Sequence, residues 1–302
     1  MPGAARRSLV RAAAEPQGGV VSRRQLAALG VTHDHVRNEV AAERWVRLGR
    51  QTVAVHLGPL PVQARAWTAV WELGEQIAAL DGVTALHAAG LTGFEEDLLH
   101  VSVRHSHDTR PLPGVRVHKV IRRVEGELLT VGVPRTRPDI AAVRAAGWAV
   151  SDRQAALLLL MAVQQRLTTP SALLDASRIC MGRRRRAFIK AVVGDVALGV
   201  QSLAELDFAK LCRARGLPEP SRQVVREGPR GRIYLDVRWD RHRLVVEIDG
   251  TQHREGLAVS VDNLTRNAVV LSGDRVLRID RIGLRLHEPA FMDQVALGLA
   301  TA

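Results

Sequence analysis

The sequence has few aromatic residues, few cysteines and no long apolar run, and each shortage excludes a class of protein. Aromatic residues make up 3% of the 302 residues, so the cores must be built from Leu, Val and Ala. Two cysteines, Cys180 and Cys212, are too few for a disulfide framework or a zinc site. The apolar run at 155–163 is too short to cross a bilayer. With no apolar segment ahead of a cleavage site, we expect a cytoplasmic protein that does not contact membranes.

Lysine is also scarce, although the chain is strongly basic. Three of the 43 basic residues are lysines, which leaves 40 arginines, and the net charge is +12. A positive field of this size favours polyanions. Nucleic acid is the better candidate than an anionic membrane, because the sequence shows no basic amphipathic helix with a bulky apolar face. The sequence leaves open whether the chain acts alone or as a homodimer.

The length favours two domains or three small ones, and the pattern along the chain predicts three. We expect a multidomain α+β or α/β protein. A winged helix-turn-helix is predicted at 1–57, a mainly helical middle region with a few strands at 58–194, and a small α/β domain at 195–302.

Helix caps carry the prediction for the N-terminal domain. Ser22 and Gln25 have the spacing of a capping box, and Thr32 caps a second helix that runs to about residue 42. Two short strands around Gly49 follow. With a short helix at 8–14, this gives the order of elements that is typical of a winged helix-turn-helix.

Four polar side chains are placed to contact DNA in such a domain. Arg37 and Asn38 lie on the polar side of the expected recognition helix, and Arg47 and Arg50 flank the expected wing. We expect them to contact phosphates and base edges. The alternative is that the domain binds another protein.

In the middle region, Trp67 and Trp71 share one face of a helix that starts near Pro61, and 99–103 and 115–120 alternate like strands. The segment 155–165 is expected to be a buried helix. The basic run at 183–186 could be a solvated face or a phosphate clamp, and we prefer the solvated face.

The segments 232–238 and 243–249 both alternate like strands and are expected to form a hairpin that turns at residues 240–241. In that register Asp236 faces Val245, and its diagonal neighbour on the same face is Glu247. The two carboxylates would lie about 5.5–8 Å apart, a gap that one divalent cation can bridge. Leu244, Val246 and Ile248 are expected to point into the core.

Asp249 points to the same face as Glu247, and Glu205 on the preceding helix could supply a fourth carboxylate. Several carboxylates on one face repel each other unless a cation offsets the repulsion. Oxygen-only ligands suit Mg²⁺ or Mn²⁺. His253 follows closely and could act as a general base or a proton shuttle.

These residues carry a resemblance over about 200–285. The motifs are Ser-Leu-Ala-Glu205, Tyr-Leu-Asp236, Glu247-Ile-Asp249-Gly250-Thr-Gln-His253, Asp262-Asn-Leu-Thr-Arg266 and Arg-Val-Leu-Arg278-Ile. This region resembles the restriction-endonuclease-like domain of very-short-patch repair endonucleases, in the PD-(D/E)XK superfamily. The first 60 residues resemble the winged helix of AbiEi-type antitoxins. The resemblance implies a DNA endonuclease in which Asp236 and Glu247 bind the metal and Glu205 is the helix acid.

One residue departs from the superfamily pattern. The lysine that follows the second acid by two residues is Asp249 here. Lys210 stands about 140° round the helix from Glu205, so it does not replace that lysine. Activation of the attacking water would then depend on the metal and His253.

Two interpretations therefore stay open. The first is a metal-dependent DNA endonuclease, and the second is an antitoxin-like DNA-binding regulator with a vestigial nuclease fold. The alternative for the acids, with no metal bound, is a solvated strand face in which they pair with Arg238, Arg243 or Arg266. Asp262 and Arg266 also have the spacing of an ordinary helical ion pair.

Overall fold

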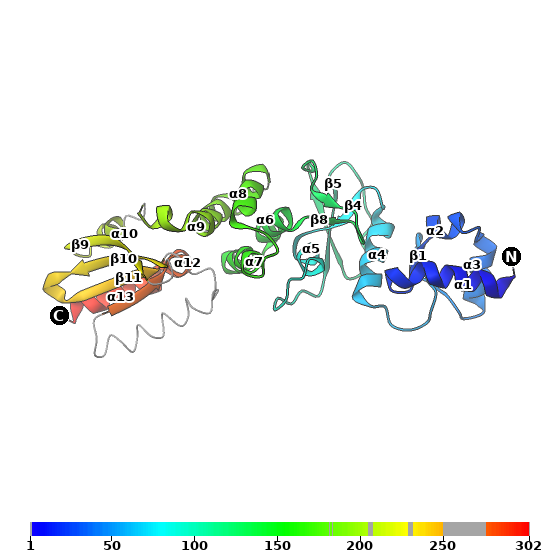
Figure 1. Ribbon diagram of the computed structural model, residues 1–302, viewed down its shortest axis with the longest axis horizontal. Helices are drawn as coiled ribbons and strands as arrows, with labels where there is room; N and C mark the ends of the chain where they lie inside the picture. The colour runs from blue at the N-terminus through cyan, green and yellow to red at the C-terminus, as the bar shows by residue number, and fades with distance from the viewer. Residues whose placement is uncertain are drawn as a thin grey trace. The chain divides into compact units, whose positions relative to one another are not determined.

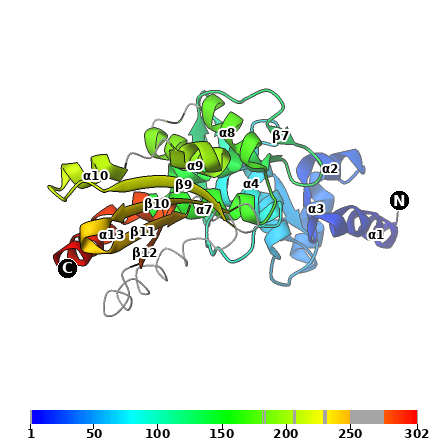
Figure 2. The same cartoon turned by 60° about the vertical axis from the view of Figure 1, so that its left-hand side comes forward.

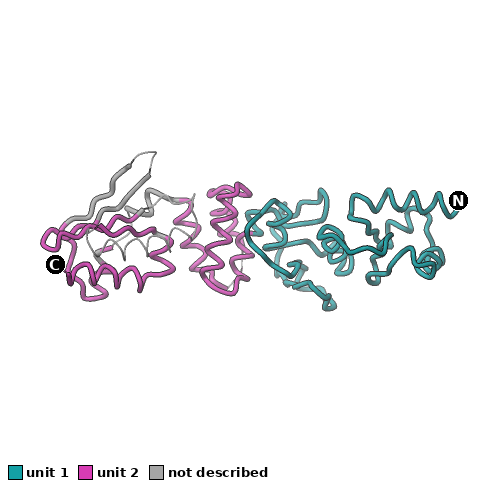
Figure 3. Tube along the Cα trace, turned by 90° about the horizontal axis from the view of Figure 1, so that it is seen from below, with its two compact units in different colours: residues 1–141 teal, residues 142–302 magenta. Residues whose placement is uncertain are grey.

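The structure is a computed structural model that describes residues 2–180, 182, 184–204, 208–228, 232–249 and 276–301. The protein is mixed α+β, and its chain divides into two compact units, residues 1–141 and 142–302 (Figures 1 and 3). This division is coarser than the three domains expected from the sequence, whose boundaries at residues 57 and 194 stay predictions. No helix in the described part of the chain is long and apolar enough to cross a bilayer.

The first unit begins with a small helical bundle beside a three-stranded antiparallel sheet in the order β1-β3-β2. Its elements are α1 (Gly3–Ala14), β1 (Val20–Ser22), α2 (Arg23–Ala28), α3 (His33–Ala41), β2 (Val46–Arg47) and β3 (Thr52–Ala54). The first helix starts five residues before the predicted residue 8, because Ala4 to Arg7 are all good helix formers. Strand β1 was not predicted, because its three residues are too few to show alternation.

Both predicted caps are confirmed. The Ser22 hydroxyl accepts from the Gln25 amide at 3.1 Å, and the Gln25 side chain accepts from the Ser22 amide at 2.9 Å. Thr32 and His35 make the same reciprocal pair at the start of α3. The caps fix the turn between the helices, and Val36 packs into the core that they enclose.

The rest of the first unit is built on a five-stranded mixed sheet in the order β6-β5-β4-β8-β7. The elements are α4 (Val62–Leu73), β4 (Ala78–Leu80), α5 (Gly82–Ala88), β5 (Leu99–Arg104), β6 (Val115–Val120), β7 (Leu128–Leu129) and β8 (Arg135–Thr136). The two predicted strands are β5 and β6, which pair in parallel. Trp67 and Trp71 stack on α4 with ring centroids 4.9 Å apart, and Trp71 is buried.

The second unit starts with helices. These are the end of α6 (Pro138–Trp148), α7 (Asp152–Gln164), α8 (Pro170–Ile179) and α9 (Arg186–Ala204). Ser151 caps α7, and the predicted burial of this helix is confirmed by an almost unbroken row of inaccessible side chains from Ala155 to Ala162.

A four-stranded sheet in the order β12-β11-β10-β9 follows (Figure 2). The elements are α10 (Phe208–Ala214), β9 (Arg222–Gly228), β10 (Arg232–Trp239), β11 (Leu244–Asp249), β12 (Val276–Asp280), α12 (Arg281–Leu286) and α13 (Glu288–Ala300). Neighbouring strands run antiparallel from β9 to β11, whereas β11 and β12 are parallel. The two strands predicted at 232–238 and 243–249 are confirmed as β10 and β11, Asp262 and Arg266 lie outside the described residues, and β9 and α12 were not predicted.

One face of this sheet is apolar. Leu244, Val246 and Ile248 are completely buried, as the alternation predicted, and Leu277 and Ile279 continue the row on β12. Side chains from α10 and α13 cover the face, among them Phe208 and Phe291. Because strand residues alternate between faces, the polar residues between these apolar ones share the opposite face.

Candidate functional site

Asp236 on β10 and Glu247 on β11 are direct cross-strand partners. The predicted register, with Asp236 opposite Val245, was therefore wrong by two residues. The chain reverses through a short 3-10 turn, Asp240–His242, followed by Arg243 in a left-handed conformation with a φ of 49°, which makes the connection two residues longer than expected. Because side chains alternate with a period of two, the shift leaves every residue on its predicted face.

The acids form a row along the polar face of the sheet. Asp249 lies two residues beyond Glu247 on β11, between Tyr234 on β10 and Asp280 on β12. Direct partners in an antiparallel pair have Cβ atoms about 4.5–5.5 Å apart, so the placement of Asp236 opposite Glu247 is closer than the diagonal one expected. Three carboxylate-bearing positions therefore adjoin one another at this point of the ladder.

Glu247 has a basic partner on the neighbouring strand. Arg278 stands opposite it on β12, and Arg278 Nε lies 3.3 Å from Glu247 Oε2. The pair is open to water, with 30% of the Glu247 side chain and 63% of the Arg278 side chain exposed. In the alternative of a solvated strand face, the acids were expected to pair with Arg238, Arg243 or Arg266. Of these, Arg238 pairs instead with Asp240, at 2.8 Å.

Asp280 is a further acid of this face that was not predicted from the sequence. It is buried, and its Oδ1 accepts from the Gly283 amide at 2.6 Å, so that it caps α12. The signal was available in the sequence as an aspartate at the end of a strand and directly before a helical stretch, a position at which Asp is a common N-cap.

The remaining predicted residues are placed only in part. Glu205 and His253 lie outside the described residues, and Asp236 and Asp249 are described by their backbone positions alone. Among the side chains that the structure does describe, no group of three or more His, Cys, Asp or Glu could hold a metal ion. The structure thus brings Asp236, Glu247 and Asp249 to adjoining ladder positions.

The four predicted DNA contacts are all on the surface of the first unit. Arg37 and Asn38 are exposed on α3, and Arg37 makes a 3.0 Å ion pair with Asp34 one turn earlier. Arg47 is exposed on β2, and Arg50 is exposed in the turn between β2 and β3. None of the four is buried by neighbouring elements.

Glu72 on α4 holds the turn that carries Arg50. Its carboxylate accepts from the Arg50 amide at 2.9 Å, from the Gln51 amide at 2.8 Å and from the Thr52 hydroxyl at 2.8 Å. The backbone of the turn is therefore fixed while the Arg50 side chain is free to reach outward. Glu72 lies about twenty residues from its partners in the sequence, so no local pattern predicted this contact.

Arg23, at the start of α2, adds a fourth basic group to Arg37, Arg47 and Arg50. Its amide donates to the Gln51 carbonyl at 2.7 Å, which ties α2 to the same turn. Burial and then the positive charge of Arg47 lower the pKa of the Arg23 guanidinium. Two guanidinium groups that repel each other in this way favour an anion between or beside them.

The comparisons with known proteins add little. A scan against protein-family models gave no match, and no curated protein matches the chain significantly. Among solved structures, the Rv2827c protein from Mycobacterium tuberculosis is similar with a TM-score of 0.40 and 17% sequence identity, over 68% of this chain and 82% of that one. At this level of similarity neither fold nor function is transferred.

Proposed function

We propose that this protein binds DNA through an N-terminal winged helix-turn-helix and hydrolyses DNA phosphodiesters in a C-terminal restriction-endonuclease-like domain that requires Mg²⁺ or Mn²⁺. The observation that carries the proposal is the direct pairing of Asp236 with Glu247. Two carboxylates in directly opposed positions repel each other at short range, and a bound cation would offset this repulsion. The order of helix, antiparallel strands, parallel strand and helix fits the domain that the resemblance implies.

The donor set fits such an ion. Asp236 and Glu247 offer only carboxylate oxygens, which are the ligands that Mg²⁺ and Mn²⁺ prefer. The chemistry supplied by the ion is polarisation of the scissile phosphate and stabilisation of the charge that develops on it. Arg278 holds Glu247 through a solvent-exposed ion pair. Such pairs contribute about 0–1 kcal/mol to stability, so a bound ion would displace Arg278 from Glu247 at little energetic cost.

The chain's own residues then have separate roles. Asp236 and Glu247 hold the ion, Asp249 extends the acidic row beside them, and Glu205 is the helix acid of the fold. His253 takes a proton from the attacking water, or gives one to the leaving oxygen, through an imidazole nitrogen.

The first unit supplies the DNA contacts in this proposal. Arg37 and Asn38 face the groove from α3, and Arg47 and Arg50 contact phosphates from the strands and turn that follow. The exposure of all four side chains and the net charge of +12 support this assignment. Arg23 joins them, because its guanidinium is close enough to feel the positive charge of Arg47.

Nicking of supercoiled plasmid tests the proposal. The wild type should nick in Mg²⁺ or Mn²⁺ and stop in EDTA, and Asp236→Asn should abolish nicking. Asp240→Asn is the matched control, since Asp240 is an acid of the same hairpin that pairs with Arg238. If the wild type cuts no duplex, single-stranded or mismatched DNA with Mg²⁺, Mn²⁺ or Co²⁺, the catalytic part of the proposal is wrong.

A DNA-binding regulator with a vestigial nuclease fold is the second candidate. It is favoured by the Glu247–Arg278 ion pair, in which a basic side chain meets the acid that would bind metal, and by Asp249 in place of the superfamily lysine. This candidate predicts DNA binding without cleavage, and a melting temperature that does not respond to millimolar Mn²⁺.

A further inference from the structure

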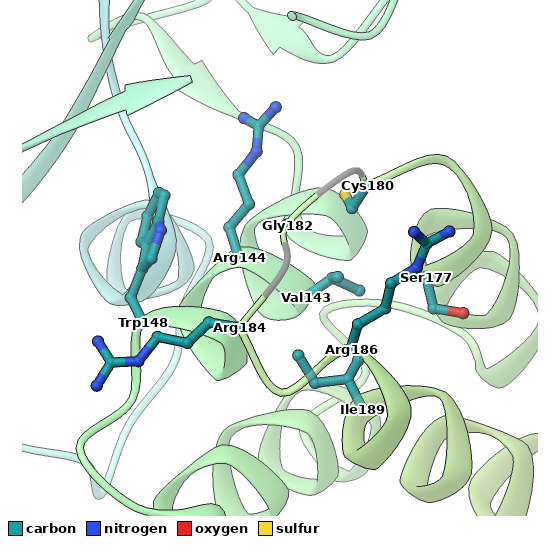
Figure 4. A pocket seen from close by; sticks show the side chains of 10 residues that line it. Val143, Arg144, Trp148, Ser177, Cys180, Gly182, Arg184, Arg186 and Ile189 are labelled. Carbon is teal, nitrogen blue, oxygen red and sulfur yellow. The ribbon is translucent and has the colours of Figure 1, made fainter. Parts of the chain in front are cut away.

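A cavity of about 170 Å³ lies in the second unit, away from the acidic row, where the ends of α6 and α8 meet the start of α9. Its floor is apolar, with Val143 and Ile189 buried, and Trp148 forms part of the wall. Figure 4 shows Trp148 and Arg184 on one side of the cavity and Arg186 on the other.

The rim of the cavity is positively charged. Arg184 and Arg186 are both exposed, and neither has a carboxylate partner among the side chains that the structure describes. Other arginines of the same stretch are neutralised: Arg185 pairs with Asp152 at 2.7 Å, and Arg178 pairs with Asp175 at 2.9 Å. Arg185 and Arg178 are thus distinct from Arg184 and Arg186, which line the cavity together with Arg144.

An apolar floor, an indole wall and a guanidinium rim define the chemistry of the ligand. The floor and the indole suit a flat aromatic ring, and the arginines suit phosphate oxygens. A nucleotide combines both groups, and the cavity has room for a base with its phosphates outside at the rim. An anion with no apolar part would make no favourable contact with the apolar floor.

We propose that this cavity binds one nucleotide of a single DNA strand, with its base against Trp148 and its flanking phosphates on Arg184 and Arg186. The choice of DNA as the source of the nucleotide rests on the proposed function. Base stacking on aromatic side chains combined with basic contacts to the backbone is the usual means by which proteins hold single strands without reading their sequence.

The test is the affinity of the full chain for a fluorescein-labelled twelve-residue oligothymidylate, measured by anisotropy in EDTA. Trp148→Leu should weaken binding roughly 5- to 150-fold, the range that loss of one stacked base gives. Trp148→Phe, which keeps a ring, should stay within about threefold of the wild type. Arg184→Gln with Arg186→Gln should flatten the slope of log K against log[salt] by about 0.7 for each phosphate that the variant no longer neutralises.

Controls separate this site from general effects. Arg178→Gln removes a charge from the same stretch but lies outside the cavity, so it should bind like the wild type. An oligonucleotide of abasic sites should bind the wild type as weakly as the normal strand binds Trp148→Leu. Melting temperatures check that each variant is folded.

Three outcomes would overturn the proposal. They are unchanged affinity in Trp148→Leu, equal affinity for the abasic strand, and displacement by free dTMP as effective per mole as displacement by the oligonucleotide, which would make a free nucleotide the ligand. Because EDTA removes the metal, these results do not depend on cleavage, and a protein that cannot nick plasmid can still pass the test.

Discussion

Arg278 Nε lies 3.3 Å from Glu247 Oε2 across the parallel pairing of β11 and β12, so the second acid of the proposed metal site has a basic partner. In the proposed function, a divalent ion would compete with this arginine for the same carboxylate. Their competition gives a measurement that separates an active nuclease site from a relic.

Replacing Arg278 by Met should strengthen Mn²⁺ binding. Removal of an exposed ion pair is worth about 0.2–1 kcal/mol, which corresponds to roughly a 1.5- to 5-fold gain in affinity by calorimetry. Arg238→Met is the control, because Arg238 pairs with Asp240 at the end of the hairpin. Glu247→Gln should abolish binding, and a wild type that binds no Mn²⁺ at millimolar concentration would contradict the metal site.

His253→Ala should lower the rate of cleavage by about 10²–10⁴-fold while metal and DNA affinities stay near those of the wild type. The reason is that a proton carrier acts in the chemical step and not in binding. A loss of thermal stability without a selective loss of rate would instead assign His253 a structural role.

Replacing Arg47 and Arg50 by Ala should weaken binding to all DNA sequences alike. The slope of log K against log[salt] should flatten by roughly 0.9 for each phosphate that these side chains neutralise in the wild type. Arg24→Ala is a suitable comparison, since Arg24 is exposed nearby and pairs with Glu75. If the double variant keeps the wild-type slope, the N-terminal domain binds a protein partner instead.

Glu72→Gln should loosen the turn between β2 and β3. The carboxylate serves three donors, and one amide oxygen cannot replace both of its oxygens, so we expect a loss of about 1–3 kcal/mol in the free energy of unfolding. Hydrogen exchange at the Arg50 and Gln51 amides should become faster. Glu75→Gln, which changes an exposed acid that pairs with Arg24, should leave these rates unchanged.

The stability of the first unit should fall as the pH drops below about 6.5. Burial, then the neighbouring His100 and Arg116, lower the pKa of His118 to about 3, and burial also lowers the pKa of His100. The folded protein therefore holds the His118 ring neutral and disfavours protonation of His100, while the unfolded chain binds protons below its pKa of about 6.5. Below this pH, each such group lowers the free energy of unfolding by up to about 1.36 kcal/mol per pH unit.

Urea denaturation between pH 5 and 8 measures this dependence above the range in which most carboxylates titrate. His118→Gln should make the profile shallower, because it removes one of the two groups. His105→Gln alters an exposed ring and should leave the profile unchanged. An identical profile in all three proteins would show that the buried pair does not control acid stability.

Local signals predicted much of this fold. The capping box at Ser22 and Gln25 depends on four consecutive residues, and the burial of Leu244, Val246 and Ile248 follows from simple alternation. Both signals are short-range, so the sequence carries them completely. The partly exposed face on which Glu247 lies was predicted for the same reason.

The features that were missed depend on contacts distant in sequence or on turn geometry. The hairpin register depends on Arg243 adopting a positive φ, which no residue preference indicated. The strand β9 is rich in charged residues and lacks clear alternation, so only its pairing with β10 defines it. Glu72 reaches its turn through the packing of α4, and Arg278 meets Glu247 only because β12 returns beside β11.

The Glu72 contact has a consequence for the thermodynamics of binding. Ordering the backbone of a flexible loop costs about 1–2 kcal/mol per residue in conformational entropy. Because Glu72 already holds the amides of Arg50 and Gln51, this entropy is given up when the chain folds, and a polyanion that meets Arg50 encounters a turn already in place. Only the arginine side chain has freedom left to lose, so association should proceed with a small unfavourable entropy at this turn.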